Sequence, residues 1–186
     1  MSKEMKEIDE RTNLAANSMF ELLLFRLGEA ANNPERRELF GINVFKVREI
    51  LVMPEITAMV NSPPEVMGVA NIRGQMITVI NLPMVVGCKP TKGLGILLVT
   101  EFARTTQAFA VEEVNEIVRL EWKHVLSAEN SGGGLVTSIA RLDGAAENTR
   151  LAQVLDVEQI LRDVMPEEVK FEESKSIPKM RLSPCL

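Results

Sequence analysis

The amino-acid sequence predicts a mostly β domain of barrel or sandwich type with a few short helices. Short runs of apolar and β-branched residues alternate with turn-forming residues along most of the chain, which is typical of all-β domains. Helix start and stop signals stand out at only two places. The chain has 186 residues, of which 46% are hydrophobic and 25% charged, and a domain of this length buries roughly 70% of its unfolded surface. We therefore expect a core that needs neither a disulfide nor a metal.

The predicted strands follow one another at short intervals. The first, MFELLLFRLG at 19–28, is almost continuously apolar, as in a strand buried on both faces. After a polar loop, LFGINVFKVREIL at 39–51 resumes extended structure until Pro54. Further strands are predicted at 76–81, 95–102, 135–144 and 149–156, with one or two more within 106–122.

Two helices are predicted from capping patterns. SPPE at 62–65 has a serine cap, proline at the first helical position and glutamate three residues on, which predicts a short helix over 63–69. Asp156 caps a second helix, whose apolar residues within 157–164 recur with i, i+3, i+4, i+7 spacing before Pro166. The segments that follow Pro83 and that span 126–134 are read as loops.

The chain divides into three parts by composition. Residues 1–18 form a polar segment, 19–166 the folded domain, and 167–186 a charged, proline-bearing linker or tail. The first 18 residues contain no continuous apolar segment, and no apolar run approaches the roughly 18 residues that span a bilayer. We therefore expect a cytoplasmic protein without direct membrane insertion. The net charge of −5, the 4% aromatic content and the lack of tyrosine argue against nucleic acid as a partner.

Residues that could carry catalysis or hold a metal are scattered. His124 is the only histidine and has no nucleophile nearby in sequence, so we interpret it as a surface or packing residue. Cys88 stands before Lys89, which could lower its pKa, but a structural role is favoured. Glu112 and Glu113 are read as charges around a solvated bend, and GGG at 132–134 as a flexible loop. We predict no enzyme activity, no cofactor and no metal site.

One arginine stands in an unusual place. Asn71, Ile72, Arg73 and Gly74 form a predicted sharp turn between the 63–69 helix and the following strand, because asparagine and glycine both tolerate positive φ. One interpretation of Arg73 is a solvated loop cation. The other is a docking residue, since arginine pairs bidentately with carboxylates and is enriched at binding hot spots.

At this turn the chain resembles a known family. GVANIRG at 68–74, followed by VINL at 79–82, is similar to the signature of the CheW-like coupling domain of bacterial chemotaxis. In that family a G-x-x-N-x-R-G turn runs into a strand reading roughly P-V-x-D-L. Thr78 and Asn81 stand where the signature usually has proline and aspartate. Other segments follow the family's order from about residue 20 to 165, namely FELLLFRLG, FGINVFKVREI, QAFAVEEVNEIVRL and LAQVLDVEQIL.

The resemblance is closest to the N-terminal domain of CheV-type proteins, in which a receiver domain follows the CheW-like domain. This sequence stops at Leu186, with a tail that resembles the start of the interdomain linker, and no residue matches a phosphoacceptor aspartate. The resemblance implies two intertwined five-stranded β-barrels of SH3 or OB type, with a short internal helix and a C-terminal helix, and no cofactor.

The implied function is a non-enzymatic scaffold in chemotaxis signal transduction. It bridges the cytoplasmic tip of methyl-accepting chemoreceptors and the regulatory domain of the histidine kinase CheA, and is recruited to receptor clusters at the inner face of the membrane. Val47 and Ile72 would give an apolar floor for a receptor helix, and Glu49 and Arg73 a polar rim. The protein-binding residues carried over from the family are Val47, Glu49, Gly68, Asn71, Ile72, Arg73 and Gly74.

Two alternatives remain at this point. Barrel folds host many functions, so an OB-like binder of single-stranded nucleic acid or a small ligand is the second hypothesis. A hydrolase or another enzyme is the third, and it lacks a catalytic constellation in the sequence.

Overall fold

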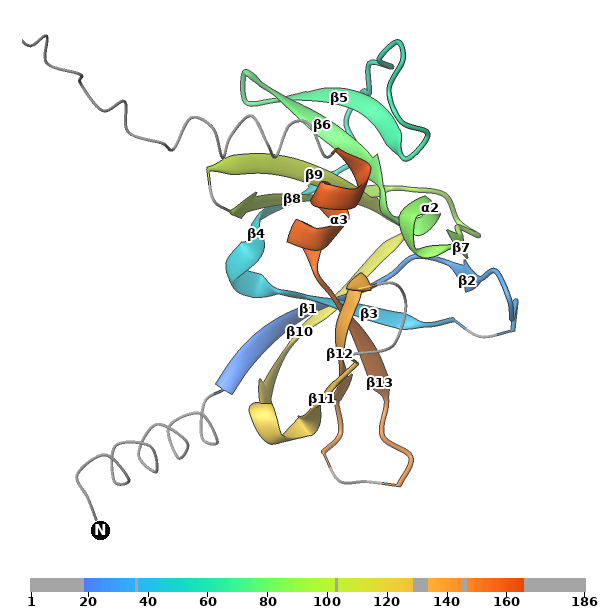
Figure 1. Cartoon of the computed structure of the whole chain (residues 1–186), viewed down its shortest axis with the longest axis vertical. Coiled ribbons are helices and arrows are strands. Elements are labelled where there is room, and N and C mark those ends of the chain that lie inside the picture. The colour runs from blue at the N-terminus through green and yellow to red at the C-terminus, as the bar shows by residue number, and fades with distance from the viewer. Residues whose placement is uncertain (1–18, 36, 103, 129–133, 145–146, 166–186) are drawn as a thin grey trace, which may run out of the picture.

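The computed structural model describes residues 19–35, 37–102, 104–128, 134–144 and 147–165, and these form a mostly β protein (Figure 1). The two larger of its three sheets, each curled toward a barrel, stack along the long axis, with one short helix between them. The strands are β1 (Met19–Arg26), β2 (Glu29–Ala30), β3 (Leu39–Asn43), β4 (Val47–Val52), β5 (Val66–Ile72), β6 (Gln75–Asn81), β7 (Cys88–Lys89), β8 (Ile96–Phe102), β9 (Thr105–Val111), β10 (Glu113–Glu121), β11 (Val125–Ser127), β12 (Val136–Arg141) and β13 (Leu151–Leu155). The short helical elements are η1 (Val44–Lys46), α2 (Leu82–Val86), η2 (Trp122–His124) and α3 (Val157–Val164).

The first sheet takes strands from both ends of the described chain. Its order is β10-β1-β3-β13-β12-β11, and β13 pairs with β3 in parallel. The resemblance predicted five strands in each barrel. Six are present here because the 3-10 turn η2 separates β10 from the three-residue β11.

The second sheet is contiguous in sequence. Its order is β4-β8-β9-β6-β5, and β6 pairs with β9 in parallel. The two edges meet because the chain beyond β4 reaches β5: Thr57 and Val69 exchange two backbone hydrogen bonds of 2.8 Å each. This bridge closes the sheet into a barrel, which removes a free edge.

The two barrels share one hydrophobic core. Its largest cluster joins Phe25 and Phe40 of the first barrel to Leu98 and Phe109 of the second. Helix α3 completes the cluster with one apolar stripe, of which Ile160 is fully buried. The intertwined two-barrel architecture expected from the resemblance is therefore confirmed.

The two halves of the chain repeat one order of elements, although no sequence repeat is evident. β3-η1-β4-β5-β6-α2 corresponds to β10-η2-β11-β12-β13-α3. In both halves a side chain caps the closing helix: Asn81 Oδ1 accepts from the N–H of Met84, and Asp156 Oδ1 accepts from the N–H groups of Glu158 and Gln159. The second cap and the helix at 157–164 were predicted correctly.

The predicted helix over 63–69 is wrong. Residues 66–72 form strand β5, which pairs with β6 along its length and with Thr57. Gly68 has a φ of 139°, which lies far from helical values. Tertiary strand pairing thus overrides the local capping pattern.

The short internal helix lies instead at α2, where a loop was expected. Asn81 caps it, Pro83 occupies its first turn, and Gly87 ends it with a left-handed φ of 75°. These are ordinary helix signals, so the loop predicted directly after Pro83 is wrong over the helical residues. The predicted loop at 126–134 is also partly wrong, since β11 includes residues 126 and 127; residues 129–133, with most of the GGG run, lie outside the described part.

Candidate functional site

The predicted turn at Arg73 is the tip of a two-residue β-hairpin. Ile72 pairs with Gln75 across β5 and β6, which leaves Arg73 and Gly74 as the loop. Both have positive φ, 53° and 85°, as in a type I′ turn, which matches the twist of the flanking strands. The Asn71 side-chain oxygen accepts a 2.9 Å hydrogen bond from the Gly74 N–H and holds the loop closed.

Arginine is an unfavourable residue at the first position of this loop. A non-glycine residue in the left-handed region costs about 1 kcal/mol or more, and asparagine or glycine is preferred there. Backbone strain of this kind gathers at functional sites. Arg73 therefore stands at the tip at the expense of local stability, with a side chain that is 74% exposed.

Arg73 is joined to Glu49, a second predicted site residue that comes from the opposite edge of the sheet. Arg73 Nη2 lies 2.8 Å from Glu49 Oε2, and the Glu49 side chain is only 14% exposed. That oxygen accepts no aligned hydrogen bond from any described residue, so the contact is an ion pair only. The structure thus brings together two residues that lie 24 positions apart, because the barrel closes between them.

Arg48 extends this contact along β4. Its Nε lies 3.8 Å from Glu49 Oε1, and its Nη1 donates a 3.4 Å hydrogen bond to Gln75 Oε1. Arg48 Nη1 also lies 3.8 Å from a carboxylate oxygen of Glu101. The carboxylate of Glu49 is therefore flanked by two guanidinium groups on an exposed face.

Gly68 has a structural reason to be glycine. A Cβ at this position would lie 2.1 Å from the carbonyl oxygen of Thr57, far inside van der Waals contact. Gly68 is buried under the bridge that Thr57 and Val69 form. Its place in the signature is thus explained by barrel closure, which positions the Arg73 hairpin against β4.

The remaining predicted residues differ in exposure. Asn71 and Gly74 are exposed at the hairpin tip, and Val47 is half-buried with contacts to the shared core. Ile72 is only 4% exposed and packs inside the second barrel. The expectation that Ile72 forms part of an exposed apolar floor is therefore wrong, because its inward register in β5 places it beneath the hairpin.

Phe45 beside Val47 was not predicted. Its side chain is 85% exposed, and it lines an open concavity of about 450 Å³ together with Val47, Arg48, Phe102 and Arg104. The 3-10 turn η1, begun by Asn43 whose side chain accepts from the Phe45 N–H, turns Phe45 outward. The prediction of continuous extended structure over 39–51 is therefore wrong at this turn, where Asn43 is a turn signal.

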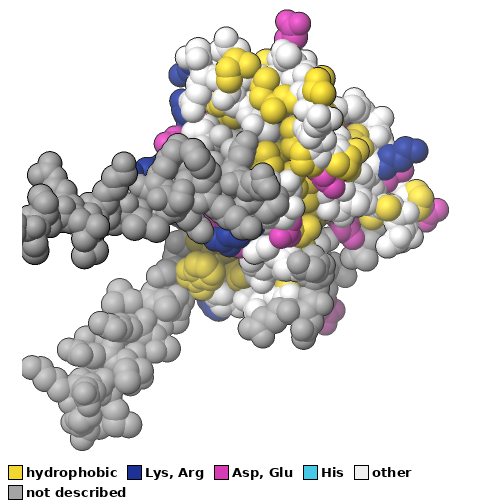
Figure 2. Space-filling view, turned by 45° about the horizontal axis from the view of Figure 1, so that its top comes forward, with side chains coloured by type: hydrophobic (Ala, Val, Ile, Leu, Met, Phe, Trp, Pro, Cys, Tyr) yellow, Lys and Arg dark blue, Asp and Glu magenta, His cyan; other side chains and the backbone are white. Residues whose placement is uncertain are grey.

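The second barrel also exposes apolar side chains elsewhere. Figure 2 shows hydrophobic side chains gathered over the part of the molecule that this barrel forms. Val52 on β4 is 81% exposed, Met76 on β6 is 59% exposed, and Val60 between the two strands is 89% exposed. Gathered apolar exposure of this kind is typical of surfaces that contact other proteins.

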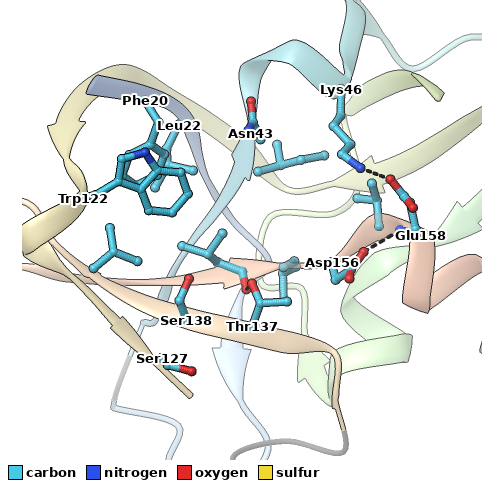
Figure 3. A pocket seen from close by; sticks show the side chains of 15 residues that line it. Phe20, Leu22, Asn43, Lys46, Trp122, Ser127, Thr137, Ser138, Asp156 and Glu158 are labelled. Carbon is cyan, nitrogen blue, oxygen red and sulfur yellow. Dashed lines mark hydrogen bonds and ion pairs between the residues drawn. The ribbon is translucent and has the colours of Figure 1, made fainter. Parts of the chain in front are cut away.

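A larger concavity lies in the first barrel and contains none of the predicted site residues (Figure 3). It measures about 560 Å³, and Phe20 stacks on Trp122 along one wall with 4.5 Å between ring centroids. Lys46 and Glu158 form an ion pair at its other end. Asp156 caps α3, so its carboxylate is already engaged within the fold.

The structure places Cys88 and His124, the residues considered for catalysis, in partly buried positions. Burial, and then the negative charge of Glu38, raise the pKa of the Cys88 thiol to about 11, so the expected lowering by Lys89 is wrong and the thiol stays protonated at neutral pH. His124 is half-buried in η2. Within the described residues, no group of His, Cys, Asp and Glu is arranged to hold a metal ion.

Glu112 is not a solvated residue as predicted. It is 8% exposed, and its Oε1 accepts from the Thr91 N–H at 2.6 Å, the Thr91 hydroxyl at 3.0 Å and the Lys92 N–H. Burial alone would raise the pKa of Glu112, but these donors outweigh it and hold the pKa below its ordinary value. The carboxylate therefore clamps the loop at 91–92 to the junction of β9 and β10.

None of the helices in the described part of the chain is both long and apolar enough to cross a membrane.

Comparison with known proteins places the chain beside chemotaxis proteins. A family model described as the CheW-like domain matches residues 21–165. Chemotaxis protein CheV3 of Helicobacter pylori is 32% identical over 155 residues, which cover 79% of this chain and 49% of the relative. Chemotaxis protein CheV2 of the same organism is 26% identical over 179 residues, covering 87% and 55%. The chain thus spans about half the length of these relatives.

One shorter relative and one solved structure are also similar to this chain. Chemotaxis protein CheW of Klebsiella aerogenes is 25% identical over 146 residues, which cover 76% of this chain and 81% of the relative. The crystal structure of the scaffolding protein TtCheW from Thermoanaerobacter tengcongensis superposes with a TM-score of 0.65 at 20% identity, covering 77% of this chain and 93% of that one. This last match supports the fold.

Proposed function

Because the chain belongs to the CheW-like family, we propose that it is a non-enzymatic chemotaxis coupling protein that bridges a chemoreceptor tip and the regulatory domain of the histidine kinase CheA. The relatives reported above are named as chemotaxis proteins, and one solved neighbour is named as a scaffolding protein. These names favour a coupling role over the OB-like alternative. Binding to receptors and kinase would recruit the protein to receptor clusters at the inner face of the membrane.

The observation that carries the proposal is the pair of Arg73 and Glu49. Arg73 is exposed on a turn that favours another residue type, and its partner Glu49 has a carboxylate oxygen without an aligned hydrogen bond. An ion pair that is incompletely satisfied in the free protein can exchange its contacts for those of a partner. The same pair contributes little to the stability of the fold, since exposed ion pairs are worth about 0–1 kcal/mol.

The surroundings of this pair suit an amphipathic helix. Arg48 connects the hairpin tip to the concavity beside Phe45 and Val47, so apolar and cationic groups follow one another along one face. A helix that places apolar residues against Phe45 and carboxylates against Arg48 or Arg73 would satisfy both kinds of group. This is the helix-in-groove mode of recognition.

The proposal is tested with Arg73→Ala in co-sedimentation with receptor-containing membranes and CheA. We expect binding to fall by about 1–4 kcal/mol, the usual cost of truncating a central interface arginine, while the fold is retained. Arg119→Ala is the matched control, because Arg119 is also exposed, at 67%, and also ion-paired, with Glu21 at 3.2 Å, but lies on β10 of the first barrel. Normal co-sedimentation of Arg73→Ala would refute the assignment.

A further inference from the structure

We infer that Arg104, at the tip of the β8–β9 hairpin, is a second carboxylate-binding residue of the partner surface, and that its partner is a receptor helix with two acidic residues two turns apart. This inference deepens the function proposed above and rests on it. Arg104 is exposed and lies outside the signature at 68–82. It lines the open concavity beside Phe45 and Val47.

Arg104 and Arg73 stand at the tips of two hairpins with similar backbone strain. Phe102 pairs with Thr105 across β8 and β9, which leaves a two-residue loop with Arg104 as its second residue. The φ of Arg104 is 69°, and among the described residues only Asn61, Arg73 and Arg104 have positive φ without being glycine. The left-handed region disfavours arginine, so local stability does not account for an arginine at either tip.

Both tips lie at the same end of the second barrel, on the left in Figure 1. β6 and β9 run in parallel, and Val79 pairs with Ala108. Four residues before this pair, the two strands reach Gln75 and Arg104, so the two loops lie at the same level. In the order β8-β9-β6-β5, Arg104 adjoins β9 and Arg73 adjoins β5. Two strand spacings, or about 10 Å, therefore separate the two arginines along the sheet.

The ion pairs around these tips leave Arg104 without a partner. Arg73 and Arg48 flank Glu49, and Arg48 Nη1 also lies 3.8 Å from Glu101. No described residue forms an ion pair or a hydrogen bond with the side chain of Arg104. Three guanidinium groups thus share two carboxylates, and the Glu49 side chain is only 14% exposed. A positive charge therefore remains at this end of the barrel.

The concavity beside Arg104 does not remove this surplus. Its charged lining residues are Lys46, Arg48, Glu101 and Arg104, and Lys46 is paired with Glu158 of α3. With the Arg73 ion pair included, four cations meet three carboxylates. A cationic surplus on a protein surface steers an acidic partner to that place.

The separation of the two tips defines the partner. Residues i and i+7 of a helix lie on one face, about 10.5 Å apart along the axis. Carboxylates at these positions can each pair with one guanidinium fork. An apolar residue at i+3 or i+4 shares this face and can contact Phe45, whose side chain is 85% exposed. Under the proposed function, the chemoreceptor tip supplies this helix.

The first test measures binding of the full chain to receptor-containing membranes and, separately, to CheA. Arg104→Gly should weaken receptor binding about tenfold or more, since hydrogen bonds to a charged group are lost. The fold is retained because glycine suits the positive φ of this position. Arg104→Lys, which keeps the charge but loses the fork, should weaken binding less. Arg119→Ala, an exposed arginine of the first barrel, should bind as the parent chain does.

Arg73→Ala in the same assay separates failure of this inference from failure of the proposed function. If Arg73→Ala loses receptor binding and Arg104→Gly keeps it, the inference is overturned and the proposed function stands. If both variants bind as the parent chain does, both are refuted. If Arg104→Gly loses binding to CheA alone, Arg104 belongs to the kinase interface and the receptor helix is excluded as its partner.

Double-mutant cycles test the spacing. Acidic residues of the receptor tip are replaced one at a time by the corresponding amide, and each change is combined with Arg73→Ala or Arg104→Gly. We expect each arginine to couple by about fivefold or more with a different acidic residue, and these two residues to lie two turns apart on one helix. Coupling of both arginines to one residue, coupling to residues one turn apart, or no coupling of Arg104 would overturn the inference.

Discussion

Glu49 and Glu112 are both nearly buried glutamates, and the structure treats them in opposite ways. Glu112 accepts three hydrogen bonds at one oxygen from the loop at 91–92. Glu49 has an oxygen whose only partner in the described chain is the exposed Arg73. A carboxylate with all its partners inside the fold organises that fold. The carboxylate of Glu49 lacks a full set of hydrogen-bond donors and lies beside a strained turn, so it can accept hydrogen bonds from another molecule.

The largest effect is expected where the fold supports the Arg73 hairpin. Gly68→Ala should destabilise the protein by about 3 kcal/mol or more, because its Cβ would meet the Thr57 carbonyl oxygen and its φ is strained. Gly74→Ala is the control: its φ is also positive, but beyond its two chain neighbours no described residue has an atom within 4 Å of the added Cβ, so only the strain of about 1 kcal/mol remains. Urea denaturation of both variants measures the difference, and equal losses would contradict the close approach at Thr57.

The next largest loss of stability is expected at Glu112, whose carboxylate is hydrogen-bonded within the fold. Glu112→Gln should lower the free energy of unfolding by about 1–2 kcal/mol, since charge-assisted hydrogen bonds from Thr91 and Lys92 become neutral ones. Glu113→Gln is its neighbour and control, because that side chain is exposed and, among the described residues, forms an ion pair with Lys92 alone, at 3.4 Å; it should change stability by no more than about 0.5 kcal/mol. Equal stability of the two variants would show that the buried hydrogen bonds of Glu112 contribute no more than the exposed ion pair of Glu113.

Acid should erase the Glu112 contribution. Because the pKa of Glu112 is lower in the folded chain than its ordinary value, the folded state holds the proton less tightly than the unfolded state. The stabilisation is therefore fully present above the usual glutamate pKa of about 4.3 and is lost as the pH falls through the folded pKa. Denaturation curves at neutral pH and near pH 3 should show the gap between the parent chain and Glu112→Gln closing in acid. A gap that widens would mean that the pKa is raised.

The smallest effect has the opposite sign. Arg73→Asn should raise the free energy of unfolding by about 0.5 kcal/mol, because asparagine suits the positive φ of this loop better than arginine does. The same variant should lose partner binding in the co-sedimentation assay. A variant that is less stable than the parent would show that the ion pair with Glu49 outweighs the turn strain.

The sequence predicted those parts of the fold that depend on local patterns. Apolar and β-branched runs predicted strands at 19–28, 76–81 and 95–102, which the structure has at 19–26, 75–81 and 96–102, and the Asp156 cap predicted α3. The pattern at 62–65 misled because a capping box describes only a local preference. Long-range pairing of β5 with β6 and Thr57 decided the outcome, and no local pattern contains that information.

The candidate site was predicted less completely, for a related reason. The resemblance located Arg73 and Glu49, but it did not place them in contact, since their approach depends on closure of the second barrel. It also grouped Gly68 and Ile72 with the exposed residues, although barrel closure and inward strand register bury both. Phe45 was missed because a 3-10 turn, not a strand, sets its direction.

The interleaving of the two barrels has a consequence for how the chain is made. All five strands of the second barrel lie within residues 47–111, whereas the first barrel combines β1 and β3 with strands that begin at residue 113. On the ribosome, the second barrel can close while β1 and β3, which pair with each other, still lack β10 and β13 at their outer edges. Open edges of apolar strands are the segments most exposed to aggregation and to chaperones during synthesis. The barrel that contains β1 and β3 is therefore completed after the second barrel, although these two strands precede the second barrel in the chain.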